Sequence, residues 1–190
     1  MFYLERQKHK LALGKPALLV IDVQNYFFDR NSPAYLRDSE RVLENIQRLL
    51  EILKGRLSII ATIHSAGSRN MEKWWGNIVE SEWARPMIRK DYFDLVILKD
   101  TYDAFFNTSL DSYLRANNVD QLLITGVMTH LCCETTARSG FVRGYEIVMI
   151  EDCLWDKDEW YHFASLRNLA HGFALISSSS EIIDLFEKTR

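Results

Sequence analysis

Short apolar runs that stop abruptly at polar residues constrain the fold of this chain more than any other feature. In the first of them, residues 17–22, five apolar residues lead directly to Asp22. A continuous apolar run of this length is typical of a parallel strand that is covered on both faces. Strand character returns in further segments, the last of them weaker, at residues 57–63, 94–98, 121–125, 145–150 and 174–177.

Helical segments alternate with these runs. Residues 40–54 carry apolar side chains at helical spacing, and Gly55 follows as a stop signal. Strands that alternate with helices predict an α/β fold, in which a parallel sheet has helices on both faces. The carboxyl ends of the strands then share one edge of the sheet, where ligands bind. The other expected helices lie near residues 108–117, 132–143, 158–171 and 180–188.

Composition fits one compact domain that spans residues 1–190. The 190 residues are 47% hydrophobic, which is enough for one substantial core. Lys and Arg number 23 against 26 Asp and Glu, and the net charge of -3 argues against nucleic acid or membrane partners. No apolar run approaches the ~20 residues that span a bilayer, and the charged start lacks a secretory signal. We therefore expect a cytoplasmic protein.

The cysteines point to reactivity rather than to disulfides or zinc. There are 3 of them, two are neighbours, and their spacing matches neither a disulfide framework nor a zinc module. Cys153 is interpreted as a small buried hydrophobe, the common role of a free cysteine. Cys132 differs because it opens the helix that follows residues 121–125. The free amides and the dipole of a helix start favour a thiolate and can receive an oxyanion.

An acid, an amine and a thiol are expected to meet at the carboxyl edge of the sheet. Asp22 and Lys99 each follow a strand directly, and Cys132 comes a few residues after a third strand. Lys99 would lower the pKa of the thiol and Asp22 could accept its proton, as a covalent hydrolase requires. Taken singly, Asp22 would fit the role of a helix cap equally well. Lys99 alone would fit better as a solvent-exposed residue at the end of a strand. Their joint placement favours catalysis.

Three segments of the chain resemble the isochorismatase-like cysteine hydrolases, which include nicotinamidases and N-carbamoylsarcosine amidohydrolases. The segments are residues 19–27, 99–105 and 125–137, and the resemblance covers roughly residues 15–180. It implies a three-layer α/β/α fold with a doubly wound, mostly parallel six-stranded sheet.

The resemblance also implies the parts of an active site. Asp22, Lys99 and Cys132 would form a catalytic triad. A cis peptide bond between Val127 and Met128 would turn the amides of Met128 and Cys132 toward one oxyanion. Strained bonds of this kind persist mainly at functional sites.

The implied reaction is hydrolysis of a C–N bond in a small amide or ureido compound. Asp22 would take the thiol proton, Cys132 would attack the carbonyl carbon, and water would then cleave the thioester. One alternative is hydrolysis of a vinyl ether, as in isochorismatases, and another is a catalytically silent protein that binds small molecules on the same fold. True isochorismatases carry glycine at the position of Cys132, so this cysteine favours covalent chemistry. Cys133 is expected to pack in the core.

Neither a metal nor another cofactor is expected. Nicotinamidases of this family bind a metal through an Asp-x-His pair and a later histidine beyond the second strand. In this chain, residues 62–69 contain one histidine, His64, and no Asp-x-His pair. His64 is therefore expected to form a hydrogen bond in the crevice or to cap a turn. His162 falls where isochorismatases also have a histidine, and we do not place it in the site.

Aromatic residues are the candidates for substrate binding. Phe27, Trp74, Trp75 and Tyr102 could line a flat pocket, and packing in a lid or in the core is equally expected for each. The irregular segment 65–92 is interpreted as an insertion over the crevice. The family resemblance implies a homo-oligomer, for which the tryptophans of this segment offer apolar contacts.

Overall fold

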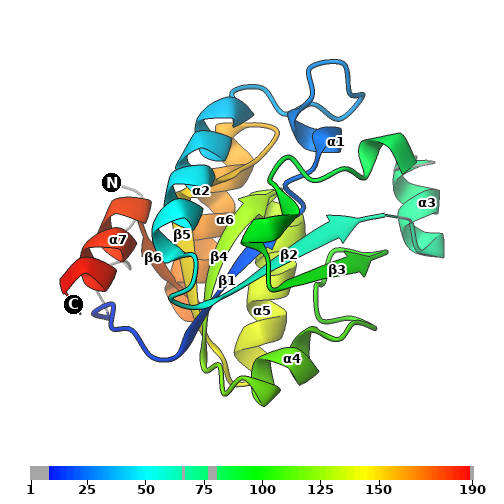
Figure 1. The fold of residues 1–190 in the computed structure, drawn as a ribbon. Coiled ribbons are helices and arrows are strands. Elements are labelled where there is room, and N and C mark those ends of the chain that lie inside the picture. Colours follow the sequence, from blue (N-terminus) through cyan, green and yellow to red (C-terminus); the bar gives the residue numbers. More distant parts are fainter. Residues whose placement is uncertain (1–8, 66, 77–80, 189–190) are drawn as a thin grey trace.

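A parallel six-stranded sheet forms the centre of the protein. The computed structural model describes residues 9–65, 67–76 and 81–188 (Figure 1). The strand order is β3-β2-β1-β4-β5-β6, and every neighbouring pair is parallel. The predicted α/β fold is confirmed, with a sheet that is parallel throughout rather than mostly so. The strands are β1 (Pro16–Ile21), β2 (Ser58–His64), β3 (Leu95–Lys99), β4 (Gln121–Val127), β5 (Glu146–Trp155) and β6 (Leu175–Ser177).

Helices cover both faces of the sheet and complete the three layers. One hydrophobic cluster joins α1, α2 and α7 to the sheet, and a second joins α4, α5 and α6 to its other face. Figure 1 shows α2 and α7 on the opposite side from α4 and α5. These helices are α1 (Asn25–Phe28), α2 (Ser39–Leu53), α4 (Leu110–Ala116), α5 (Glu134–Val142), α6 (Glu159–Gly172) and α7 (Ser179–Lys188).

The first apolar run forms the strand β1, which lies between β2 and β4. Successive side chains of a strand point to opposite faces. Accordingly, Leu18 and Val20 pack in one hydrophobic cluster, whereas Leu19 and Ile21 pack in the other. Because both faces are covered, the run is apolar at every position, and its abrupt end delivers Asp22 to the carboxyl edge of the sheet.

Gly126 allows β4 to pass close to the end of β1. Its φ of 114° lies in the region that glycine adopts most easily. A Cβ at this position would overlap the backbone of Ile21, including its carbonyl oxygen. The register between β4 and β5 also shifts at this point, between Ile124 and Gly126. Only glycine therefore satisfies the close approach of the two strands immediately before Asp22.

The irregular segment between β2 and β3 contains the helix α3 (Arg69–Trp75) and two 3₁₀ turns, η2 (Ser81–Trp83) and η3 (Lys90–Tyr92). Residues 66 and 77–80 of this predicted insertion lie outside the described residues. The Gln24 side-chain amide donates to the carbonyl oxygens of His64 at 3.0 Å and Trp83 at 3.1 Å. Its oxygen accepts from the His64 amide at 2.8 Å. A buried glutamine thus ties the end of β2 to this segment.

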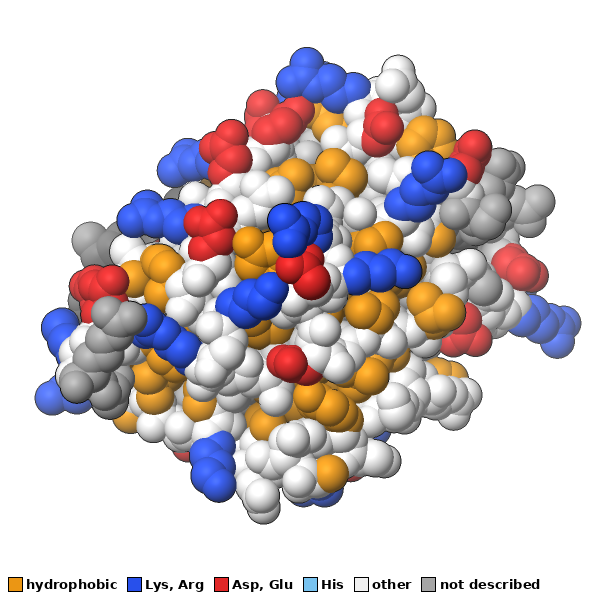
Figure 2. Space-filling model, in the orientation of Figure 1, with side chains coloured by type: hydrophobic (Ala, Val, Ile, Leu, Met, Phe, Trp, Pro, Cys, Tyr) orange, Lys and Arg blue, Asp and Glu red, His pale blue; other side chains and the backbone are white. Residues whose placement is uncertain are grey.

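The surface carries both signs of charge. Figure 2 shows Lys and Arg interspersed with Asp and Glu on one face, without a large area of a single sign. This pattern agrees with the net charge of -3. Among the described residues, no helix has both the length and the apolar character needed to cross a membrane.

Candidate active site

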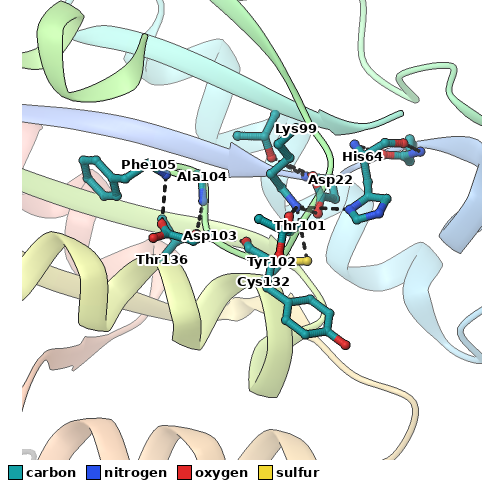
Figure 3. Close-up of polar contacts among 12 residues, drawn as sticks. Asp22, His64, Lys99, Thr101, Tyr102, Asp103, Ala104, Phe105, Cys132 and Thr136 are labelled. Carbon is teal, nitrogen blue, oxygen red and sulfur yellow. Dashed lines mark hydrogen bonds and ion pairs between the residues drawn. The ribbon is translucent and has the colours of Figure 1, made fainter. Parts of the chain in front are cut away.

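Asp22, Lys99 and Cys132 converge at the carboxyl edge of the sheet (Figure 3). Asp22 follows β1, Lys99 is the last residue of β3, and Cys132 lies in η4 (Thr129–Cys133), a turn of π-helix between β4 and α5. Since β2 separates β3 from β1, the long Lys99 side chain reaches past β2 to the Asp22 carboxylate. The Lys99 Nζ lies 2.7 Å from Asp22 Oδ2 and 3.3 Å from Cys132 Sγ.

The Asp22 carboxylate is held in one orientation by two strands. Thr62 of β2 donates its hydroxyl hydrogen to Asp22 Oδ1 at 2.7 Å. The backbone amide of Asp22 donates back to the Thr62 carbonyl oxygen at 3.1 Å. Asp22 is fully buried and has a left-handed φ of 53°, a conformation unusual for a residue other than glycine. The position is therefore fixed by the protein before any ligand arrives.

Lys99 carries a buried ammonium that lies among four acceptors. Besides Asp22 and Cys132, it contacts the Thr101 carbonyl oxygen at 2.9 Å and His64 Nδ1 at 3.4 Å. Burial by itself would lower the pKa of Lys99, but the negative charge of Asp22 and the hydrogen bonds to Asp22 and Cys132 outweigh it and raise the pKa above its ordinary value. The amine is consequently a cation at neutral pH, despite its burial.

Lys99 lowers the pKa of Cys132 as expected, but the net shift is in the opposite direction. Burial raises the pKa of the thiol well above its ordinary value, and the opposing effect of Lys99 does not reverse this. The nearby Asp22 carboxylate raises the pKa further. The helix start was expected to favour a thiolate, but the buried position of Cys132 outweighs that preference. The thiol is thus protonated at rest, beside a carboxylate that can accept its proton.

His64 is part of this cluster but does not make it a metal centre. Burial and the Lys99 charge lower its pKa to about 4, so the imidazole is neutral at pH 7. Ligand atoms of Asp22, His64 and Cys132 lie within 4.8 Å of one another. All three contact the Lys99 ammonium, which a divalent cation would have to displace. These three side chains are of types that also bind metals, but in this structure each of them contacts the Lys99 ammonium.

The loop that follows β3 is anchored on α5. The amide of Ala104 donates to Thr136 Oγ1 at 3.0 Å, and Asp103 Oδ1 accepts from the Phe105 amide at 2.8 Å (Figure 3). Asp103 Oδ2 also accepts from the Ser139 hydroxyl at 2.7 Å. These contacts hold the Thr101 carbonyl against the ammonium of Lys99.

A cavity of about 590 Å³ opens beside Cys132. Phe27, Trp75 and Tyr102 line it, and the indole N–H of Trp75 donates to the Tyr102 hydroxyl at 2.6 Å. Trp74 does not line this cavity, because it points into a neighbouring one and is 79% exposed. Consecutive residues of a helix point about 100° apart, which explains why these two tryptophans separate.

The backbone before Cys132 has the form that the family resemblance implies. The peptide bond between Val127 and Met128 is cis. Met128 and Cys132 both line the cavity. As predicted, Cys133 and Cys153 are fully buried. They lie in opposite hydrophobic clusters. His162 is buried against Thr129, with 2.9 Å between its Nδ1 and Thr129 Oγ1, and it does not line this cavity.

The sequence analysis missed a polar group at the mouth of the cavity. His130, Lys157 and Tyr161 line the cavity, and Asp156 lies behind His130. Asp156 directly follows β5, so the rule that singled out Asp22 at the end of β1 also applies to it. A polar residue directly after a buried strand is thus a signal that could have identified Asp156.

The family assignment follows from comparison with known proteins. The model of the isochorismatase domain matches residues 16–181. The chain belongs to the isochorismatase family. This confirms the resemblance found in the sequence, and the amidohydrolases among its relatives support a hydrolase.

Two curated relatives and one solved structure show how far the similarity extends. Nicotinamidase 3 of Arabidopsis thaliana is 33% identical over 172 residues, which cover 84% of this chain and 83% of that protein. The ureidoacrylate amidohydrolase of Acinetobacter baylyi is 37% identical over 95 residues, which cover 50% of this chain and 39% of that protein. A cysteine hydrolase from Pseudomonas syringae shares the fold with a TM-score of 0.87 at 23% identity, over 95% of this chain and 97% of that one.

The thiols of this isochorismatase-family protein should differ in reactivity. Cys132 lines the cavity, whereas Cys133 and Cys153 are 0% exposed. Limited treatment with iodoacetamide at neutral pH should therefore label Cys132 at least about tenfold faster than either of the others. Peptide mapping with fragment spectra separates the adjacent Cys132 and Cys133. Loss of the label in Cys132→Ala, with labelling retained in Cys133→Ala, is the control. Equal labelling of the three thiols, or preferential labelling of Cys153, would contradict the assignment.

Proposed function

We propose that this protein is a cysteine hydrolase that cleaves a C–N bond in a small amide or ureido compound. The observation that carries the proposal is the buried contact of one ammonium with both a carboxylate and a thiol, 2.7 Å from Asp22 and 3.3 Å from Cys132. The cavity beside this contact has about the volume of known small-molecule sites. The names of the relatives, a nicotinamidase and a ureidoacrylate amidohydrolase, support the same class of bond.

The first half-reaction forms a thioester. Asp22 accepts the proton of the Cys132 thiol, and the sulfur attacks the substrate carbonyl carbon to give a tetrahedral oxyanion. The protonated Asp22 then gives its proton to the leaving nitrogen, the C–N bond breaks, and ammonia or an amine departs. Because the thiol is protonated at rest, this transfer to Asp22 is coupled to the attack rather than completed before it.

The second half-reaction returns the free enzyme. Asp22 takes a proton from water, and the resulting hydroxide attacks the thioester carbonyl. The C–S bond breaks, the thiolate takes the proton back from Asp22, and the acid leaves. Both halves use the same carboxylate as base and then as acid.

The remaining residues act through charge and position. The Lys99 ammonium offsets the negative charge as it moves between Asp22 and Cys132, which lowers the free energy of each charged intermediate. The backbone amides of Met128 and Cys132 form the oxyanion hole in this proposal. Phe27, Trp75 and Tyr102 contact the substrate, and their position on the cavity wall supports this role. Trp74 lies outside this cavity, so the proposal gives it no contact with the substrate.

A substrate screen tests the central proposal. Small amide and ureido compounds are incubated with the protein, and release of ammonia or amine is measured together with the intact mass of the protein. We expect turnover with at least one of them and an acyl adduct on Cys132. Cys132→Ala and Asp22→Asn should each lower turnover at least about 10³-fold, because the nucleophile and its base act as a unit.

The matched control for this screen is Cys133→Ala, which changes the neighbouring buried thiol. Amide turnover that survives in Cys132→Ala would contradict the thioester mechanism. Cleavage of a vinyl ether included in the screen, with no amide hydrolysed, would replace the proposal with the vinyl ether type of hydrolysis. Compounds that bind without turnover would indicate a silent binding protein.

Turnover should not depend on a metal ion. The Lys99 ammonium occupies the space between the three groups that could hold one. Exhaustive dialysis against EDTA should leave the rate within about twofold, a difference that corresponds to less than 0.5 kcal/mol. A loss of activity on dialysis that zinc restores would show that the crevice is a metal site.

We also propose that the protein is cytoplasmic and that copies of it associate. The free cysteines support a reducing compartment. The edge strand β3 leaves Leu98 65% exposed, and Trp74 and Phe106 are likewise exposed. A second copy that covers these apolar groups would remove them from water.

Light scattering at micromolar concentration tests this association. We expect an oligomer in which Trp74→Ala weakens assembly and leaves turnover nearly unchanged, because Trp74 is 79% exposed and outside the cavity beside Cys132. Trp75→Ala should lower turnover instead, because Trp75 lines that cavity. A monomer at this concentration would exclude a stable assembly, and loss of turnover without loss of assembly in Trp74→Ala would place that residue in the pocket.

A further inference from the structure

One nitrogen of the His64 ring lies in the wall of the cavity without a hydrogen-bond partner. His64 is the last residue of β2, is 3% exposed, and lines the cavity beside Cys132. Its Nδ1 faces the Lys99 ammonium (Figure 3), whereas its Nε2 is buried and has no partner among the described residues. Buried polar atoms without a partner are rare in native proteins, and each of them needs an explanation.

The Lys99 ammonium determines which nitrogen of the ring carries the hydrogen. An ammonium can donate but cannot accept, so a hydrogen on Nδ1 would point at a cation 3.4 Å away. The hydrogen therefore lies on Nε2. Burial and the Lys99 charge lower the pKa of His64 to about 4, so the ring does not take up a second proton at neutral pH. His64 thus presents one neutral N–H donor to its surroundings.

The end of β2 holds this donor in place. Gln24 accepts from the His64 amide at 2.8 Å and donates to the His64 carbonyl oxygen at 3.0 Å. The parallel register also sets His64 directly opposite Lys99 of β3. Turning the ring to bring Nε2 to another acceptor would take Nδ1 away from Lys99. The protein therefore keeps an unpaired donor in this wall rather than rearranging to satisfy it.

The reacting atoms of the substrate do not need this donor. In the proposed reaction, the oxyanion lies at the amides of Met128 and Cys132, and the leaving nitrogen receives its proton from Asp22. Asp22 follows β1 and Cys132 follows β4, whereas His64 ends β2 on the other side of β1. The donor is therefore available to a part of the ligand other than the bond that is cleaved.

We infer that His64 is a substrate-binding residue, whose Nε2–H donates to an acceptor of the substrate other than the oxygen of the carbonyl that Cys132 attacks. The inference rests on the proposed function in assigning that carbonyl oxygen to the Met128 and Cys132 amides. It selects amides with a second acceptor, an oxygen or a ring nitrogen, because an analogue without one would leave the buried N–H unpaired. Support of Lys99 alone would explain the contact of Nδ1 and would leave Nε2 unexplained.

Nitrogen-15 NMR of the 5 histidines tests the first step of this inference. The signals that disappear in His64→Gln identify the His64 ring. We expect its Nε2 to carry the hydrogen and its Nδ1 to be bare, with no change between pH 6 and pH 8, because the pKa lies near 4. A hydrogen on Nδ1 would overturn the inference. Zinc that binds at the His64 nitrogens would also overturn it, by assigning the ring to a metal.

A set of four amides tests the second step. Benzamide and the three pyridinecarboxamides have the same shape, and each pyridinecarboxamide adds one acceptor at a different ring position. Dissociation constants are measured by NMR titration in Cys132→Ala, which prevents turnover. We expect at least one pyridinecarboxamide to bind about threefold to tenfold more tightly than benzamide, the effect of one hydrogen bond. Its binding should shift the signal of the His64 Nε2–H.

Two substitutions of His64 separate its two nitrogens. Asparagine can offer an oxygen to Lys99 but is too short to place a donor at Nε2, so His64→Asn should abolish the preference over benzamide. Glutamine can place an amide N–H near the position of Nε2, so His64→Gln should keep the preference within about twofold. His171→Asn alters an exposed residue outside the cavity and is the matched control. Thermal unfolding shows that each variant is folded.

These outcomes are distinguishable from failure of the proposed function. A preference that His64→Asn removes and His64→Gln keeps supports the inference even when no amide in the screen is hydrolysed. A preference that survives in His64→Asn overturns it, as does equal binding, or no binding, of the four amides. Hydrolysis of benzamide and the pyridinecarboxamides with equal kcat/KM would support the proposed function and overturn the role of His64.

Discussion

The buried ion pair between Lys99 and Asp22 is the interaction on which the site depends. Two charges removed from water are unfavourable unless each has close partners. Here Asp22 has the Thr62 hydroxyl, and Lys99 has the Thr101 carbonyl and His64 Nδ1. The pair joins the ends of β1 and β3 across β2, so it requires all three strands to end at the same level. It also acts on Cys132, because the ammonium opposes the effect of burial on the thiol pKa without reversing it.

Much of the fold could be predicted from local sequence. Each of the six strands overlaps the apolar run that predicted it, because a strand packed in the core is mostly apolar along its length. The strand β5 continues to Trp155, past the predicted end at residue 150, where the polar Glu151 and Asp152 interrupt the apolar run. The meeting of Asp22, Lys99 and Cys132 was predictable for the same reason. Parallel strands with right-handed crossovers bring their carboxyl ends to one edge, whichever order the strands take.

The properties that were not predicted depend on contacts between distant parts of the chain. Local sequence predicts that Cys132 lies at the start of a helix. The burial that raises its pKa comes instead from the packing of residues far from it in the sequence. Trp74 and Trp75 are neighbours on α3 and point in different directions from it. The sequence of this irregular segment does not show which side of so short a helix, seven residues long, faces the cavity. The His130 ring is held by Asp156, which lies 26 residues further along the chain, and local sequence does not reveal a contact over that separation.

The contact between Gly126 and Ile21 has a consequence for how this site can change. Asp22 follows one of these strands, and Cys132 follows the other by a single turn. The separation of β1 and β4 at their ends is limited by backbone atoms in direct contact, with no side chain between them. A side chain at position 126 would act as a spacer and move the carboxylate away from the sulfur. The distance between the Asp22 carboxylate and the Cys132 sulfur is thus limited by the main chain, and substitutions elsewhere in the cavity can alter its lining while leaving that distance unchanged.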